Sequence, residues 1–124
     1  MKKLVLILIF AGILSILSAH PASKVEAKFD NKTKMLSVSY LHSVKNNSKH
    51  FITEIAIELN GKEIITQQLN FQDDKKQGDL SYKIIDAKEN DKIKVTTRCN
   101  KGGKKGTELK VMPVKASKTP LIKK

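Results

Sequence analysis

The sequence is poor in several residue types on which whole classes of protein depend. Among its 124 residues there is one cysteine and no tryptophan, and aromatic residues make up only 5%. The single cysteine, Cys99, excludes a disulfide within the chain and leaves a free thiol, an intermolecular bridge or a metal ligand. Base stacking and guanine recognition rely on aromatic residues and arginine. The chain has only one arginine, Arg98, so we expect no nucleic-acid partner.

Lysine dominates the charge of the chain. Lysine and arginine together number 24 against 12 acidic residues, which gives a formal net charge of +12. One interpretation is an ordinary soluble surface that carries lysines. The other is a positive field that attracts small anions or the anionic surface of a cell envelope. Composition alone leaves both interpretations open.

The first 19 residues have the pattern of a secretory signal peptide. Two lysines precede an apolar run of about 14 residues, which ends in small residues at Ser18 and Ala19. A membrane anchor is the alternative, but a spanning helix needs roughly 20 apolar residues. We therefore expect residues 1–19 to be removed, which leaves a mature chain with no membrane span, exported to the periplasm or cell envelope of a bacterium. About 105 residues then remain from His20 onward, enough for one domain.

Apolar and polar residues alternate with a period of two along most of the remaining chain, which is typical of strands with one buried face. Asn60-Gly61 between two such runs predicts a type I′ hairpin. Loops are expected at the polar stretches 43–49 and 72–79. Seven strands are predicted, at about 25–29, 36–42, 51–59, 63–71, 80–84, 93–99 and 107–112.

The fold class that this pattern predicts is all-β, with no credible helix after residue 19. Seven short antiparallel strands separated by polar turns favour an immunoglobulin-like β-sandwich of two sheets. The sandwich domain would cover residues 20–112. Residues 113–124 are basic and without a clear pattern, so we expect a mobile tail there.

Four candidate metal ligands lie at predicted strand ends rather than in strand centres. The three histidines of the chain are His20, His42 and His50, and Cys99 closes the sixth predicted strand. In an antiparallel sandwich the end of one strand and the start of the next meet at the same edge, so His42, His50 and Cys99 can converge. His20 precedes the first predicted strand, so its placement is freer. Three imidazoles and one thiolate suit iron, copper or zinc. The alternative is three scattered surface histidines and a buried cysteine.

The order of these residues resembles a known family. The stretch LHSVKNNSKHFITEIAIELNGKEI, followed later in the chain by RCNKGG, resembles the iron domain of superoxide reductases, which is found in neelaredoxin and in the C-terminal part of desulfoferrodoxin. The resemblance covers about residues 20–111 and implies a seven-stranded immunoglobulin-like sandwich. It also implies a mononuclear iron site in which His20, His42 and His50 are equatorial ligands and Cys99 is the axial thiolate.

The activity that this resemblance implies is that of a superoxide reductase-like oxidoreductase. Such a protein reduces superoxide, a small anion, by one electron at an iron with an open sixth position. An electron donor is then required, and the sequence does not identify it. The family motif Cys-Asn-x-His-Gly has its histidine where this chain has Gly102, so the expected ligand set is incomplete.

Two other functions are compatible with the same residues. If cleavage follows Ala19, His20 becomes the first residue, and its α-amine and imidazole can chelate copper(II) together. The protein would then be a periplasmic carrier of copper or another metal. The remaining alternative is a non-metal immunoglobulin-like module that binds a partner through its lysines. Self-association into a homo-oligomer is compatible with all three functions.

Overall fold

The structure, a computed structural model, describes residues 20–114, which form seven β-strands and no helix. The strands are β1 (Lys24–Asp30), β2 (Met35–Leu41), β3 (Ile52–Leu59), β4 (Lys62–Gln68), β5 (Gln77–Lys83), β6 (Lys92–Cys99) and β7 (Lys104–Lys110). The predicted all-β fold class and the predicted seven strands are confirmed for this part of the chain.

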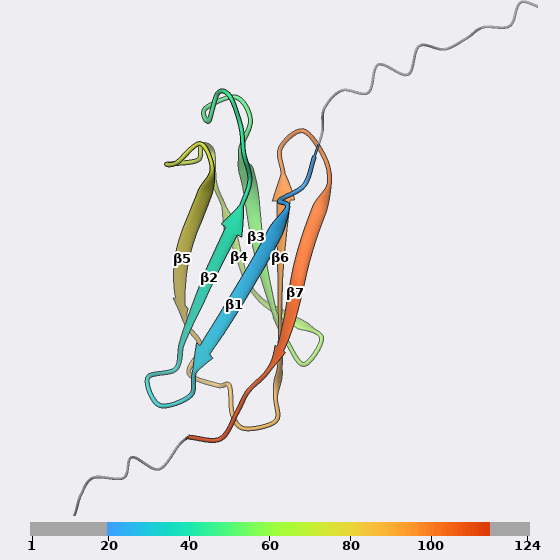
Figure 1. Cartoon of the computed structure of the whole chain (residues 1–124). Helices are drawn as coiled ribbons and strands as arrows, with labels where there is room; N and C mark the ends of the chain where they lie inside the picture. The colour runs from blue at the N-terminus through green and yellow to red at the C-terminus, as the bar shows by residue number, and fades with distance from the viewer. Residues whose placement is uncertain (1–19, 115–124) are drawn as a thin grey trace, which may run out of the picture.

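The strands form two antiparallel sheets. One sheet has the order β1-β2-β5 and the other has the order β4-β3-β6-β7. In Figure 1, β1 and β2 lie in front of β3 and β4. This is the immunoglobulin-like order, in which the second and fifth strands pair in one sheet and the third and sixth in the other. The predicted immunoglobulin-like sandwich is therefore confirmed.

The core lies between the two sheets and is almost entirely aliphatic. Alternation along each strand turns every second side chain inward, because successive residues of a strand point to opposite faces. The inward residues from the centres of β2, β3 and β6 are at most 4% exposed, and they include Leu36, Val38, Tyr40, Ile55, Ile57, Ile93 and Val95. Burial of these side chains is the main favourable term in the stability of a domain that contains no disulfide in its described part.

The start of β3 differs from the predicted alternation. The sequence pattern placed Phe51 and Thr53 on the buried face with Ile55, whereas Ile52 is the fully buried residue and Thr53 is half-buried. The register of β3 against β6 shifts between Ile52 and Glu54, which indicates a bulge. A bulge exchanges the two faces of a strand, so an alternating pattern cannot predict which residues face inward on both sides of it.

Two strands begin earlier than predicted. β5 starts at Gln77, inside the predicted loop 72–79, where Gly78 leaves room for the ring of its partner Tyr40. β7 starts at Lys104 instead of residue 107, because Gly102 and Gly103 adopt positive φ and close a tight turn after β6. Polar and lysine-rich strand ends carry no apolar alternation, so the sequence pattern missed both.

The predicted Asn60-Gly61 hairpin is confirmed. Both residues have positive φ, 51° and 83°, as a type I′ turn requires, and β3 pairs with β4 around them. The Asn60 side chain also donates a 3.0 Å hydrogen bond to Asp91, which joins this hairpin to the loop before β6. The hairpin lies at the end of the sandwich opposite to the end of β2 (Figure 1).

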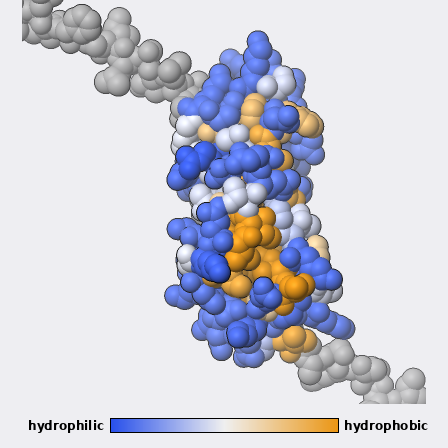
Figure 2. Space-filling view, turned by 180° about the vertical axis from the view of Figure 1, so that it is seen from behind, coloured by the Kyte–Doolittle hydropathy of each residue, from blue (hydrophilic) through white to orange (hydrophobic). Residues whose placement is uncertain are grey.

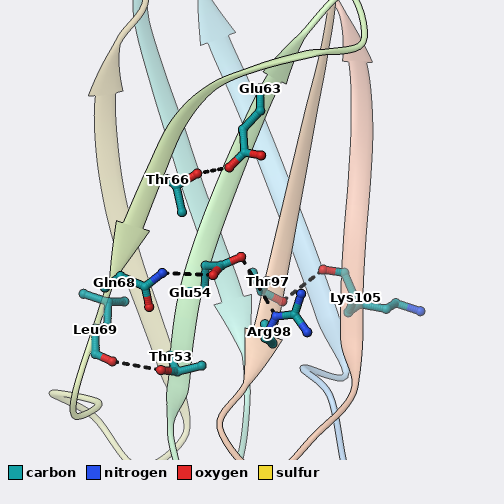
Figure 3. A network of polar contacts seen from close by, with 9 residues as sticks. All are labelled: Thr53, Glu54, Glu63, Thr66, Gln68, Leu69, Thr97, Arg98 and Lys105. Carbon is teal, nitrogen blue, oxygen red and sulfur yellow. Dashed lines mark hydrogen bonds and ion pairs between the residues drawn. The ribbon is translucent and has the colours of Figure 1, made fainter.

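Polar contacts tie the four-stranded sheet together near the start of β3 (Figure 3). Gln68 on β4 donates a 2.9 Å hydrogen bond to Glu54 on β3, whose other oxygen lies 3.9 Å from Nε of Arg98 on β6. The hydroxyls of Thr53 and Thr97 donate to backbone carbonyls of neighbouring chain segments, at 3.1 and 3.0 Å. These contacts hold the sheet in register at the end where β3 begins and β6 finishes.

The surface seen from behind is mainly hydrophilic. Figure 2 shows apolar residues gathered over one part of that face, with hydrophilic residues around them. Within residues 20–114, no helix has the length and apolar character needed to cross a membrane. The predicted signal peptide, residues 1–19, lies outside the described residues. The same holds for the predicted tail, residues 113–124, apart from its first two residues. Both therefore stay predictions.

We expect Ile55→Ala to destabilise the domain by about 2–5 kcal/mol, because it removes a fully buried side chain from the centre of β3 and leaves a cavity. Ile85→Ala is the matched control, since Ile85 is 70% exposed and should change the free energy of unfolding by less than about 0.5 kcal/mol. Chemical denaturation measures both. Equal effects of the two substitutions would contradict the assignment of the core.

Candidate metal centre

One end of the sandwich carries all four candidate ligands. His42 directly follows β2, His50 lies just before β3, Cys99 is the last residue of β6, and His20 precedes β1. In Figure 1 this is the end at which the arrowheads of β2 and β6 lie. The sequence predicted that strand ends would bring His42, His50 and Cys99 together, and the antiparallel topology does so. His20, whose placement the sequence left free, lies beside His42 and His50.

The three histidine rings form a compact cluster. The ring centroids of His20 and His42 lie 4.9 Å apart, and the other two centroid distances, both to His50, are 4.8 Å. One nitrogen from each ring can be chosen so that all three lie within 4.8 Å of one another. The three histidines differ in burial: His42 is 1% exposed, His50 is half-buried and His20 is exposed. The cluster thus has a buried side and a side open to solvent.

Cys99 lies against this cluster. Its Sγ is 3.1 Å from Nε2 of His50, and the residue is only 2% exposed. The backbone of Cys99 is fixed on both sides of the following turn, since its N–H donates to Gly103 at 3.1 Å and its carbonyl accepts from Gly102 at 3.0 Å. The thiol is therefore held next to an imidazole and shielded from solvent, which matches neither a surface thiol nor an isolated core cysteine.

The environment of His50 favours its neutral form. Desolvation lowers the pKa of this imidazole below its ordinary value, and the positive charges that His42, His20 and Lys101 can carry lower it further. A neutral ring has a lone pair on one nitrogen, which is the form that binds a metal.

Asn100 ties Cys99 to the segment that contains His50. Its side chain accepts a 3.0 Å hydrogen bond from the N–H of Phe51 and donates one of 2.9 Å to the carbonyl of Lys49. The N–H of Asn100 also donates to the carbonyl of Phe51 at 3.0 Å. An asparagine directly after the cysteine thus clamps the residues on either side of His50, which gives a physical reason for the Cys-Asn pair.

Gln72 is a residue of this site that the sequence did not indicate. It lies in the loop before β5, yet it is 1% exposed and its Oε1 is 2.9 Å from Nδ1 of His42. A glutamine at the edge of a polar loop has no periodic signal that marks it as buried. Only its position in the tertiary structure, behind the most buried histidine, identifies it.

The open side of the cluster is a positively charged cleft of about 560 Å³. His20 and His50 form part of its wall, and Lys45, Lys49 and Lys101 line it as well. Three exposed lysines around one opening raise the local concentration of small anions. A positive field that attracts small anions was one of the two interpretations of the composition, and these three lysines lie beside the histidine cluster.

A glycine allows the segment before β1 to reach the cluster. Gly103 has φ of +91°, and a Cβ at this position would lie 2.9 Å from Cδ and 3.0 Å from the nitrogen of Pro21, the residue after His20. Gly102, which stands where the resembling family has a histidine, also has positive φ, +113°, a region that L side chains rarely adopt. The turn after Cys99 therefore packs closely against Pro21, and its two glycines, Gly102 and Gly103, have no side chain that could bind a metal.

The donor set fits a first-row transition metal. Neutral imidazole suits iron, copper and zinc, and thiolate adds a softer ligand. The nitrogen atoms lie within 4.8 Å of one another and would have to move closer to share one ion, because metal–nitrogen bonds are about 2.0–2.1 Å long. The described residues supply three imidazoles and one thiol, one ligand fewer than the resembling family has.

Comparison with known proteins adds to this description at the level of the fold. No protein-family model and no curated sequence matches the chain. Among solved structures, it is similar to superoxide reductase (1Fe-SOR) from Giardia intestinalis, with a TM-score of 0.55 and 15% sequence identity, over 73% of this chain and 99% of that chain. Similarity at this level of identity shows the fold, that of a distant superoxide reductase-like β-sandwich.

We expect Gly103→Ala to destabilise the domain more than Gly61→Ala, by at least about 1 kcal/mol. Both glycines have positive φ, so both substitutions strain the backbone, but only the Cβ at position 103 collides with Pro21, and position 61 is open. Chemical denaturation gives the difference, and the ring resonances of His20 should shift only in Gly103→Ala. Equal stability of the two variants with unchanged His20 resonances would show that Pro21 is not held by this turn.

Proposed function

We propose that this protein is a superoxide reductase-like domain that binds one iron through His20, His42, His50 and Cys99 and reduces superoxide. The observation that carries the proposal is the cluster of three imidazoles with the Cys99 thiol 3.1 Å from one of them. The fold similarity to a superoxide reductase supports it independently of the cluster.

Bound iron would supply the one-electron redox chemistry, and the residues of this chain would supply its ligands and its surroundings. Reduction of superoxide to hydrogen peroxide takes up one electron and two protons. The electron would come from a donor outside this chain. Burial of His42 and Cys99 would keep one side of the site fixed and dry, while the exposed side, at His20, would stay open to a small reactant.

The lysine-lined cleft supports an anionic reactant. Lys45, Lys49 and Lys101 surround the open side of the cluster, and no acidic residue is among those that line this cleft. Superoxide carries one negative charge, so a positive opening would raise its rate of encounter with the site. Export to a bacterial periplasm or cell envelope belongs to the same proposal and rests on the apolar stretch of residues 4–17.

The first test is the metal content of the natively purified protein. We expect about one iron per chain after anaerobic purification, and a thiolate-to-iron absorption band after oxidation. Cys99→Ser should abolish this band, because a hydroxyl is a poor substitute for a thiolate. Thr97→Ser is the matched control on the same buried face of β6, and its band should be unchanged.

Three results would contradict the iron proposal. One is a protein without iron, and another is a spectrum that does not change in Cys99→Ser. The third is copper in place of iron, which would favour the alternative of a copper carrier. A copper affinity that falls when one residue is added before His20 would then identify an N-terminal chelate.

The second test concerns the positive cleft. We expect Lys49→Glu to lower the rate of superoxide reduction several-fold and to weaken the dependence of that rate on ionic strength, because a positive charge next to the site is reversed. Lys62→Glu makes the same charge change beside the Asn60-Gly61 hairpin, at the opposite end of the sandwich. Pulse radiolysis at several salt concentrations measures both rates. Equal rates in the two variants would exclude a local role of the cleft.

A further inference from the structure

Gln72 connects the end of β2 to the start of β3 from behind the histidine cluster. Its Nε2 donates to the backbone carbonyls of His42 and Asp74, both at 2.8 Å. Its Oε1 lies 2.9 Å from Nδ1 of His42 and accepts a longer hydrogen bond, 3.4 Å, from the N–H of Ile52. All polar atoms of this buried side chain are therefore paired, two of them with the same histidine.

The backbone of Gln72 is held by the loop that joins the two histidines. Its N–H donates to the carbonyl of Asn47 at 2.9 Å, and the side chain of Asn47 donates back to the carbonyl of Gln72. Asn47 belongs to the segment between His42 and His50. The glutamine side chain thus starts from a fixed backbone position and has little freedom to move away from His42.

The contacts of Nε2 determine which way the amide faces. If the amide were turned over, Oε1 would face the carbonyl oxygens of His42 and Asp74, which cannot donate, and Nε2 would face the N–H of Ile52. Unpaired polar groups are costly in a buried position. The oxygen is therefore the atom that lies next to Nδ1 of His42.

This orientation decides the tautomer of His42. An amide oxygen can only accept, so Nδ1 carries the hydrogen and donates it to Gln72. In the neutral ring the lone pair then belongs to Nε2, which points toward His20, whose carbonyl oxygen lies 3.2 Å away. Nε2 is therefore the ring atom that keeps a lone pair, on the side of the ring that faces His20.

We propose that Gln72 is a positioning residue that holds His42 in the Nδ1–H tautomer and so presents Nε2 as the metal-binding atom. Hydrogen-bond partners of ligand imidazoles fix the orientation of the ring and raise its basicity, and their loss typically costs about 10–100-fold in metal affinity. The metal-binding half of this inference rests on the proposed function. The tautomer half concerns the metal-free protein alone.

The tautomer is tested by ¹⁵N NMR of the histidine rings in metal-free protein at a pH of about 8.5, where ordinary imidazoles are neutral. We expect the Nδ1–H form of His42 in the wild type. In Gln72→Met no acceptor remains, so the Nε2–H form should become populated, because it can donate to the carbonyl of His20. An Nε2–H form in the wild type would overturn the inference, even if Gln72→Met did not fold.

Metal affinity is measured with Fe²⁺ alone, under anaerobic conditions, in competition with a chelator. We expect Gln72→Met to weaken binding about 10–100-fold. Gln67→Met is the matched control, because it removes a side-chain hydrogen bond to Tyr82 away from the cluster, and its affinity should equal that of the wild type. Weaker binding in Gln72→Met with an unchanged tautomer would reduce Gln72 to a structural role and overturn the inference.

The two readouts separate this inference from the proposed function. If the wild-type protein failed to bind Fe²⁺, the proposed function would fail, and the NMR experiment would still decide whether Gln72 fixes the tautomer of His42. If the wild type bound Fe²⁺ and Gln72→Met kept the Nδ1–H form with full affinity, only the inference on Gln72 would be wrong.

Discussion

The antiparallel pairing of β3 with β6 is the interaction on which the rest of the structure depends. These two strands form the centre of the four-stranded sheet, and their inward side chains, such as Ile57 and its partner Val95, form the middle of the core. Beyond the register shift at the start of β3, the same pairing opposes Ile52 to Cys99. The segment that leads into β3 therefore lies beside the Cys99 thiol, and Nε2 of His50 contacts Sγ of Cys99. A single pairing thus fixes both the core and half of the candidate metal centre.

The end of the sandwich that carries the histidines is built from paired polar groups instead of an apolar cap. A buried polar group is tolerated only where it is hydrogen-bonded, and His42, Gln72 and Asn100 each satisfy this condition through neighbours on other segments. The three lysines of the adjacent cleft would repel a bound cation at long range. They are exposed, so solvent and salt screen this repulsion, whereas imidazole and thiolate donors would contact the ion directly.

Much of the fold followed from the alternation of apolar and polar residues. It predicted the number of strands, and Asn60-Gly61 predicted the hairpin with its positive φ angles. The errors have local physical causes. A bulge at the start of β3 exchanged its faces, so Ile52 is buried in place of Phe51, and β5 begins with the polar Gln77, which no apolar pattern marks. The alternation of apolar and polar residues reflects only which side chains are buried, so it gives no signal where a strand is polar or irregular.

For the candidate site, the sequence by itself determined the chemical types of the donors and their places at strand ends. It also determined that Gly102 offers no side chain where the resembling family has a histidine. Only the tertiary structure decided that the three rings meet within 5 Å, that Gln72 supports His42, and that lysines from two separate loops share one cleft. The reason is that ligands distant in sequence converge through strand register and loop hydrogen bonds. Both depend on contacts between segments, which the order of residues along the chain does not specify.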